Sequence, residues 1–335
     1  IKNKMNSTEH LDHVALTNNS LLFPTLFKQA WGVFKKKWCA LFTLALMPVI
    51  FLVSSYVILI SAVYVVMKLS GVDDVLYTVF NVFHFAPQYV SAVFSISGII
   101  IVLGTIYFAL RATVASVKIL SSEEKVSLRH AWHGISFKTI GSLFAVAVLL
   151  GIILAGGYVL LFVPVLFLAT FYSNAIFTNI VEGKKGIDAL VLSRQYVKGY
   201  GAIVFVNLLV IFSVGILFGL LFKLALGLGG LMAVAVYFGK ISLISAVLIA
   251  LIVIVIGVLL LILWKSFAFV FTYLMFKKLQ ALKVHHSANL AEGRKAVKVW
   301  LLLAIIVLAI YVGVMAALKH SKVFTSVQSQ QLESF

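Results

Sequence analysis

The sequence predicts an all-α polytopic membrane bundle of about seven transmembrane helices. Of its 335 residues, 63% are hydrophobic and only 11% are charged, whereas soluble domains carry about 25% charged residues. The apolar residues gather in runs close to or above the roughly 20 residues that a membrane-spanning helix needs. These runs cover about residues 39–67, 88–117, 140–161, 163–181, 201–226, 241–276 and 298–318.

The spacing of these runs divides the chain into four parts. We expect a polar N-terminal tail (1–19), a six-span membrane domain (20–280), a cytoplasmic link with the seventh span (281–318) and a polar C-terminal tail (319–335). The first apolar run is too long for the apolar region of a signal peptide, so we expect no cleavable signal. Cys39 is the single cysteine, which excludes an internal disulfide and a Cys-based metal cluster.

The third and fourth runs form one apolar stretch about twice as long as a single span. Gly156-Gly157 and Pro164 interrupt this stretch. Proline inside a helix removes a hydrogen bond and clashes with the preceding turn. We therefore expect a tight hairpin between two spans.

Charge predicts the orientation of the spans. The net charge is +17, and the basic residues gather in the segments 1–38, 118–138, 182–200 and 277–298. Lys and Arg are enriched on the cytoplasmic side of membrane proteins. We therefore expect a cytoplasmic N-terminus and an outside C-terminus, in a bacterial inner membrane. Because the charges lie between spans, anionic lipid headgroups are the expected partner, and nucleic acid is not.

Three of these basic segments also carry apolar residues at three- and four-residue steps, which predicts cytoplasmic amphipathic helices lying in the membrane interface. The stripes are Phe23, Leu26, Phe27, Ala30, Trp31, Phe34 and Trp38; then Leu128, Ala131, Trp132 and Ile135; then Ile187, Leu190, Val191 and Val197. Such a helix precedes each pair of spans, with Trp31 and Trp132 at equivalent places. This pattern indicates a threefold internal repeat with span seven appended, or amphipathic segments that share a pattern without a repeat.

Two stretches, "LFKQAWGVFKKKWCALFTLAL" and "IVEGKKGIDALVLSRQYVKGYGAIVFVNLL", carry a resemblance to a known family. The matching residues are Ala30, Trp31, Lys35, Glu182, Gly183, Ala189, Leu190, Ser193, Arg194, Val197, Lys198 and Gly199. Over roughly residues 20–280 the chain resembles the polytopic membrane domains found ahead of glycerophosphodiester phosphodiesterases, many of which stand alone. The sequence contains no such phosphodiesterase domain, so the resemblance implies the architecture and no catalytic residues.

The segment 177–201 carries unusually many charges for this chain. Gly183 and Gly186 allow a turn, and Asp188 suits the start of the following helix. The segment predicts either an anion site for a lipid phosphate or phosphorylated ligand, or a connector whose bases meet anionic lipid. The candidate lipid- or anion-binding residues are Arg194, Lys198, Lys184 and Lys185, together with Lys35 and Lys36 of the first segment. Arg194 could instead pair with Glu182 or Asp188.

Polar residues inside the spans are candidates for a cavity, because each is costly in lipid without a partner. They are Arg111, Asn174, Asn207 and Lys265, and Asn179 is a further polar residue of the fourth span. Arg111, Asn174 and Lys265 occupy corresponding places and could form a polar ring. Alternatively, Arg111 and Lys265 snorkel to the headgroups and the asparagines bond neighbouring helices. Asp and Glu are absent from the depth of every run, which disfavours proton- or sodium-coupled transport.

Signals for metals, cofactors and catalysis are weak. His130 and His133, and the pair His285-His286, lack acidic or cysteine companions at ligand spacing. Asp73-Asp74 with His84 could suggest a divalent ion, but an ordinary solvated loop is the simpler interpretation. Gly-rich 226–230 indicates a flexible outer turn. We therefore predict no metal, no cofactor and no catalytic residues.

The sequence thus favours a non-enzymatic integral membrane module, acting as a scaffold, subunit or regulator. It would contact anionic lipid and another membrane protein. The alternative is a carrier or flippase for a lipid or small amphiphile. An intramembrane enzyme would need a carboxylate or histidine cluster that the sequence does not display.

Overall fold

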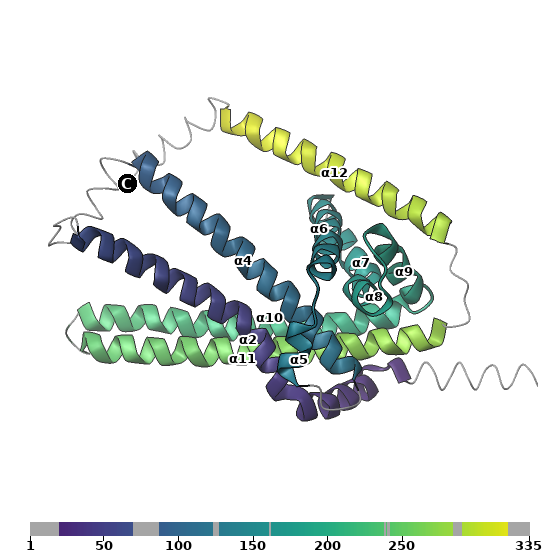
Figure 1. The fold of residues 1–335 in the computed structure, drawn as a ribbon, viewed down its shortest axis with the longest axis horizontal. Coiled ribbons are helices and arrows are strands. Elements are labelled where there is room, and N and C mark those ends of the chain that lie inside the picture. The colour runs from purple at the N-terminus through teal and green to yellow at the C-terminus, as the bar shows by residue number, and fades with distance from the viewer. Residues whose placement is uncertain are drawn as a thin grey trace, which may run out of the picture. The chain divides into compact units, whose positions relative to one another are not determined.

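The computed structural model describes residues 20–69, 87–122, 127–160, 162–237, 239, 242–283 and 290–320. Within them every regular element is a helix (Figure 1). The helices are α2 (Phe23–Leu69), α4 (Pro87–Ser121), α5 (Leu128–His133), α6 (Phe137–Leu160), α7 (Phe162–Tyr172), α8 (Ala175–Glu182), α9 (Ile187–Val197), α10 (Gly201–Tyr237), α11 (Leu243–Lys283) and α12 (Leu290–His320).

Seven stretches among the described residues are long and apolar enough to cross a membrane. They are Phe23–Ala62, Ser95–Ser121, Phe137–Leu160, Pro164–Glu182, Gly201–Leu224, Ile244–Lys283 and Gly293–Ala317. The described residues therefore confirm the all-α class and the prediction of seven helices that could cross a membrane. The predicted tail 1–19 lies outside the described residues, as does the C-terminal tail beyond residue 320.

The chain forms two compact units, each built from segments far apart in the sequence. Unit 1 comprises residues 1–31, 141–214 and 271–335, and unit 2 comprises residues 32–140 and 215–270. Each unit therefore depends on long-range packing between helices.

Apolar side chains cover much of the surface of the long helices. Ile58 of α2, Ile100 of α4 and Ile244 of α11 are among many large apolar residues that are more than half exposed. Soluble monomers rarely expose contiguous apolar patches of this kind. These faces suit contact with lipid chains, which agrees with the predicted integral membrane protein.

The predicted helix breaks at Gly156-Gly157 and Pro164, between spans three and four, are not found at those residues. Gly156 and Gly157 do not break the helix but lie within α6, which ends at Leu160. They allow close packing instead, because a Cβ at Gly157 would lie 2.8 Å from Cδ1 of Leu168 on α7. Pro164 lies in the first turn of α7, where a missing N–H leaves no helical hydrogen bond unmade.

The first predicted amphipathic segment is not a separate helix. Residues from Phe23 onward belong to α2, which continues to Leu69 and contains the first span. Its stripe is divided, since Leu26 and Ala30 are buried whereas Trp31 is exposed. The Gly-rich segment 226–230 also differs from its prediction as a turn, because it lies within α10.

Helix α9 forms the centre of unit 1. Its residues Ala189, Leu190 and Val191 have no exposed surface, and it packs against α7, α8 and α12 (Figure 1). The surrounding core consists of Val146, Ile153, Leu168, Tyr172, Ala175 and Val297. The apolar stripe predicted for this segment is therefore covered by protein, and its location in the membrane interface stays a prediction.

Close packing of α6 against α12 predicts a glycine requirement at residue 156. A Cβ there would lie 2.4 Å from Cβ of Ala304, so Gly156→Ala should force the helices apart and destabilise unit 1 by about 1–3 kcal/mol. Gly151, five residues earlier in α6, has open space around it. Thermal unfolding in detergent should show that Gly156→Ala lowers the Tm, whereas Gly151→Ala does not lower it. Equal Tm values for the two variants would contradict this packing.

Candidate functional site

The fourth span is broken in the middle. Helix α7 ends at Tyr172 and α8 begins at Ala175, with Asn174 at φ −94° and ψ 0° between them. Backbone groups freed inside a membrane protein must find new partners. The hydroxyl of Ser193 on α9 supplies them, accepting from the N–H of Asn174 (3.2 Å) and donating to the carbonyl of Phe171 (2.9 Å).

A second hydroxyl strengthens the same junction. The hydroxyl of Thr178 on α8 lies 2.8 Å from the carbonyl oxygen of Ala175 and 2.9 Å from that of Ala189. Its proton can therefore satisfy its own helix or α9. These contacts explain why α9 is held against the break.

The side chain of Asn174, unlike the other polar groups at the break, has no hydrogen-bond partner among the described residues. It is fully buried, yet neither its amide nitrogen nor its oxygen has a hydrogen-bond partner within the described residues. A buried polar group left unsatisfied costs about 1–3 kcal/mol. The break therefore carries a local energetic cost, which is a feature common at functional sites.

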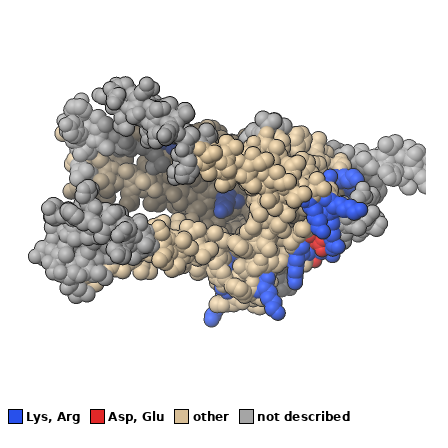
Figure 2. Space-filling model, turned by 90° about the horizontal axis from the view of Figure 1, so that it is seen from above, with Lys and Arg blue, Asp and Glu red and all other residues tan. Residues whose placement is uncertain are grey.

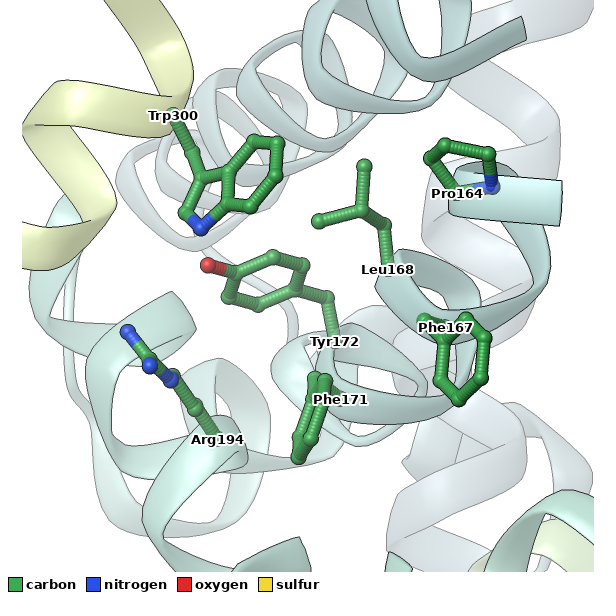
Figure 3. Close-up of a pocket in the computed structure, with 7 residues that line it drawn as sticks. All are labelled: Pro164, Phe167, Leu168, Phe171, Tyr172, Arg194 and Trp300. Carbon is green, nitrogen blue, oxygen red and sulfur yellow. The ribbon is translucent and has the colours of Figure 1, made fainter. Parts of the chain in front are cut away.

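A cavity of about 350 Å³ lies beside the break (Figure 3). Its lining is Pro164, Phe167, Leu168, Phe171 and Tyr172 from α7, Arg194 from α9 and Trp300 from α12. We call this the Arg194 cavity. Figure 3 shows the Tyr172 hydroxyl and the Arg194 guanidinium pointing toward the side of the cavity where the Trp300 indole lies. One cationic group thus borders an otherwise aromatic and aliphatic space.

The two carboxylates that could have paired with Arg194 are engaged elsewhere. Glu182 accepts hydrogen bonds from the Tyr196 hydroxyl (2.5 Å) and from the Gln280 amide (3.0 Å). Asp188 binds Arg294. The predicted pairing of Arg194 with either carboxylate is therefore wrong, and within the described residues its guanidinium has no hydrogen-bond or ion-pair partner.

The Glu182 contact also perturbs Tyr196. Burial, followed by the hydrogen bond to Glu182, raises the pKa of Tyr196 well above its ordinary value of 10.0. The phenol therefore stays protonated at physiological pH and donates to the carboxylate. This bond links α9 to the end of α8.

An ion pair joins α9 to α12, which carries Trp300. Nε and Nη2 of Arg294 donate to the two carboxylate oxygens of Asp188 at 2.6 and 2.8 Å. The hydrogen bond from Arg294 is the main cause that lowers the pKa of Asp188. Gly293 lies against Val191 in the same contact, where a Cβ would come within 2.4 Å. These contacts position the α12 wall of the Arg194 cavity.

The other predicted lipid-contacting residues lie outside the cavity lining. Lys184 and Lys185 are exposed in the loop before α9, and Lys198 is exposed just after it. Lys35 and Lys36 are exposed on α2 and belong to unit 2. Figure 2 shows Lys and Arg side chains gathered on part of the visible face, with Asp or Glu atoms among them.

The predicted cavity residues have separate roles. Arg111 donates to the Tyr107 hydroxyl (3.0 Å) and the Trp132 carbonyl (3.2 Å), and its guanidinium carbon lies 4.9 Å from the Trp132 ring centroid. It therefore fastens α5 to α4. Asn207 is buried and donates to the carbonyl of Leu21 at 2.9 Å. Lys265 lines a smaller cavity in unit 2.

These positions bear on the predicted polar ring. Arg111 and Lys265 belong to unit 2, whereas Asn174 belongs to unit 1. Of the asparagines predicted to bond neighbouring helices, Asn179 does so, since its amide donates to the Ser142 hydroxyl of α6 at 2.8 Å. The Asn174 side chain makes no such bond within the described residues. The ring itself stays a prediction.

Metal-binding side chains do not cluster in the described part of the chain, where no group of three or more His, Cys, Asp and Glu could hold an ion. His130 and His133 lie on α5. His285-His286, Asp73-Asp74 and His84 lie outside the described residues.

Comparison of the chain with known protein families, curated proteins and solved structures found no match. The family resemblance described above therefore stays a prediction.

Sequence reasoning missed most of the Arg194 cavity. Phe167, Phe171 and Tyr172 looked like ordinary span residues, and Trp300 lies more than a hundred residues away from Arg194. One signal was available, because the polar pair Ser173-Asn174 inside an apolar run marks a place where a helix can break. Pairing of that break with α9 depended on tertiary packing.

The Asp188–Arg294 ion pair predicts a specific pH dependence. Because folding lowers the pKa of Asp188 below its ordinary 3.8, the pair stabilises the protein above pH 3.8, and this contribution disappears as pH falls through the folded-state pKa. Asp188→Asn should therefore lower Tm near pH 6 by about 1–2 °C, since the pair is partly exposed. The gap to wild type should close in acid.

The matched control is Arg294→Gln, which removes the other partner. It should reproduce the gap near pH 6, and the double variant should add nothing further. Strictly additive effects of the two substitutions would show that the pair does not act as a unit.

Proposed function

We propose that this chain is a non-enzymatic integral membrane module that binds an anionic amphiphile or lipid in the Arg194 cavity. The observation that carries this proposal is the guanidinium of Arg194, which has no hydrogen-bond or ion-pair partner among the described residues and borders an apolar cavity of about 350 Å³. A ligand with an anionic head and an apolar body would complement both features at once.

Arg194 indicates the chemistry of the ligand's head group. A guanidinium presents a planar fork of donors that matches a carboxylate or a phosphate. Electrostatic attraction is stronger away from bulk water, and Arg194 is only partly exposed. The neighbouring Tyr172 hydroxyl supplies one further donor at the same end of the cavity (Figure 3).

The remaining lining residues indicate that the rest of the ligand is apolar. Phe167, Leu168, Phe171 and Trp300 present aromatic and aliphatic surface. Small-molecule sites are commonly apolar cavities of about 300–1,000 Å³ with few polar groups that fix orientation. The lining contains no carboxylate, histidine, cysteine or serine, and binding requires none of them.

The setting of this module follows from charge and surface. We place it in a bacterial inner membrane with a cytoplasmic N-terminus, because the basic segments favour that orientation. The exposed apolar faces of the long helices would contact lipid and a partner membrane protein. The module would then act as a scaffold, subunit or regulator that responds to the bound amphiphile.

Lipids with brominated chains can test occupancy of the cavity, because bromine quenches tryptophan fluorescence on contact and Trp300 lines the site. The full chain would be titrated in micelles with brominated phosphatidylglycerol. Arg194→Gln should raise the lipid concentration at half-maximal quenching about tenfold, as expected for loss of a charge-assisted hydrogen bond. The same substitution should change the midpoint measured with brominated phosphatidylcholine much less.

Two controls make this result specific. Lys198→Gln removes the same charge four residues further on, at an exposed site, and should leave the midpoint within twofold. Trp300→Phe should remove the responsive part of the signal. An equal effect of the Arg194 and Lys198 variants would refute the cavity as the binding site.

The break in the fourth span supports a second candidate function, a carrier or flippase for a lipid or small amphiphile. Discontinuous helices often form the substrate sites of transporters, and this break borders the Arg194 cavity. Proteoliposomes with a fluorescent phosphatidylglycerol should then show protein-dependent movement between leaflets, which Arg194→Gln slows. Movement at the rate of protein-free vesicles would exclude this candidate.

A further inference from the structure

Unit 2 contains a second cavity, of about 100 Å³, which is separate from the site proposed above. Its lining is Leu41, Ala45 and Pro48 from α2, Ala109, Ala112, Thr113 and Ser116 from α4, and Lys265, Ser266 and Phe269 from α11. We call it the Lys265 cavity.

Small side chains create this space. Three helices meet through alanines and serines, so few large side chains can fill the volume between them. Pro48 lies inside α2, and its ring has no N–H to donate to the carbonyl of Leu44 and strains the preceding turn. The cavity is therefore a consequence of residue choice on all three helices.

The cation in this cavity has no counter-ion among the residues of unit 2 that the structure describes. Within the described residues, unit 2 contains no Asp or Glu, and the ammonium of Lys265 makes no hydrogen bond or ion pair there. An ionisable side chain inside a membrane segment normally finds a partner and is a functional-site hypothesis by default. The Lys265 side chain is exposed, so an anion from outside the chain can reach its ammonium.

A hydroxyl beside the lysine is also unused. Thr113 and Ser266 donate to the carbonyls of Ala109 (2.8 Å) and Ile262 (2.9 Å) on their own helices. Ser116 is more than nine-tenths buried and makes no hydrogen bond within the described residues. Lys265 and Ser116 are thus two donors without acceptors in the described part of the chain, which suits an oxygen-rich anion.

The position of Lys265 along α11 agrees with such a ligand. The preceding stretch Ile244–Trp264 is almost wholly apolar and is roughly 31 Å long at 1.5 Å per residue. That length equals the hydrocarbon thickness of a bilayer. If Ile244–Trp264 crosses the hydrocarbon region, Lys265 falls at its end, at the depth of the lipid phosphates.

We propose that the Lys265 cavity binds a phosphate oxyanion, held by the Lys265 ammonium and the Ser116 hydroxyl. Its volume of about 100 Å³ is smaller than that of an engineered cavity of about 150 Å³ that binds one benzene molecule. It accommodates a small anionic group and not an acyl chain. The phosphate could belong to a lipid headgroup or be free in solution, and both have the same oxygen acceptors.

Native mass spectrometry of the full chain can test this proposal in an Arg194→Gln background, which separates it from the first cavity. Phosphatidylglycerol and inorganic phosphate are the two probes. Lys265→Gln should weaken binding of one probe about tenfold, and Ser116→Ala should weaken it less. The matched control is Lys223→Gln, a lysine of unit 2 outside the cavity lining, which should stay within twofold.

The two probes distinguish the source of the phosphate. Lysine-dependent retention of phosphatidylglycerol that millimolar inorganic phosphate does not displace identifies a lipid headgroup. Saturable, lysine-dependent binding of inorganic phosphate identifies a free anion. If Lys265→Gln lowers the Tm strongly, Lys265→Arg keeps the charge and should retain binding. Equal affinities of the Lys265 and Lys223 variants for both probes would overturn the proposal.

Discussion

The hydrogen bonds that α9 makes to the broken fourth span are the interaction on which unit 1 depends. Ser193 accepts from Asn174 and donates to Phe171, so a break that would be costly in an apolar environment becomes a defined junction. Because Arg194 follows Ser193, this junction also places the guanidinium beside the cavity. The same residues therefore hold the helices together and build the site.

The acidic side chains described in unit 1 are paired, whereas two basic side chains border cavities. Asp188 and Glu182 hold α9 to α12, α8 and α11 through Arg294, Tyr196 and Gln280. These two carboxylates of unit 1 are thus used for structure. Arg194 and Lys265 are left facing cavities in their separate units without acidic partners among the described residues. In a basic chain this arrangement favours anionic ligands, with the apolar surfaces left to lipid.

Particular residues show how far prediction from the sequence could go. The seven spans follow from run length and composition, which depend only on local sequence. The turn before α9 was expected from its glycines, and Gly183 and Gly186 indeed have φ of 67° and 51°. Gly156 and Gly157 were expected to break a helix and instead allow neighbouring helices to approach. A glycine serves both purposes, and only the neighbouring helix decides between them.

By itself, therefore, the sequence determined the class of protein, the number of spans and the candidate status of Arg194 and Lys265. Hydropathy and charge are properties of short segments, so they can be read before folding. Tertiary structure alone decided that Arg294 pairs with Asp188, that Arg111 binds Trp132 and Tyr107, and that α7, α9 and α12 line one cavity. Each of these outcomes requires competition among residues distant in sequence, and only packing settles which partner comes close enough to bind.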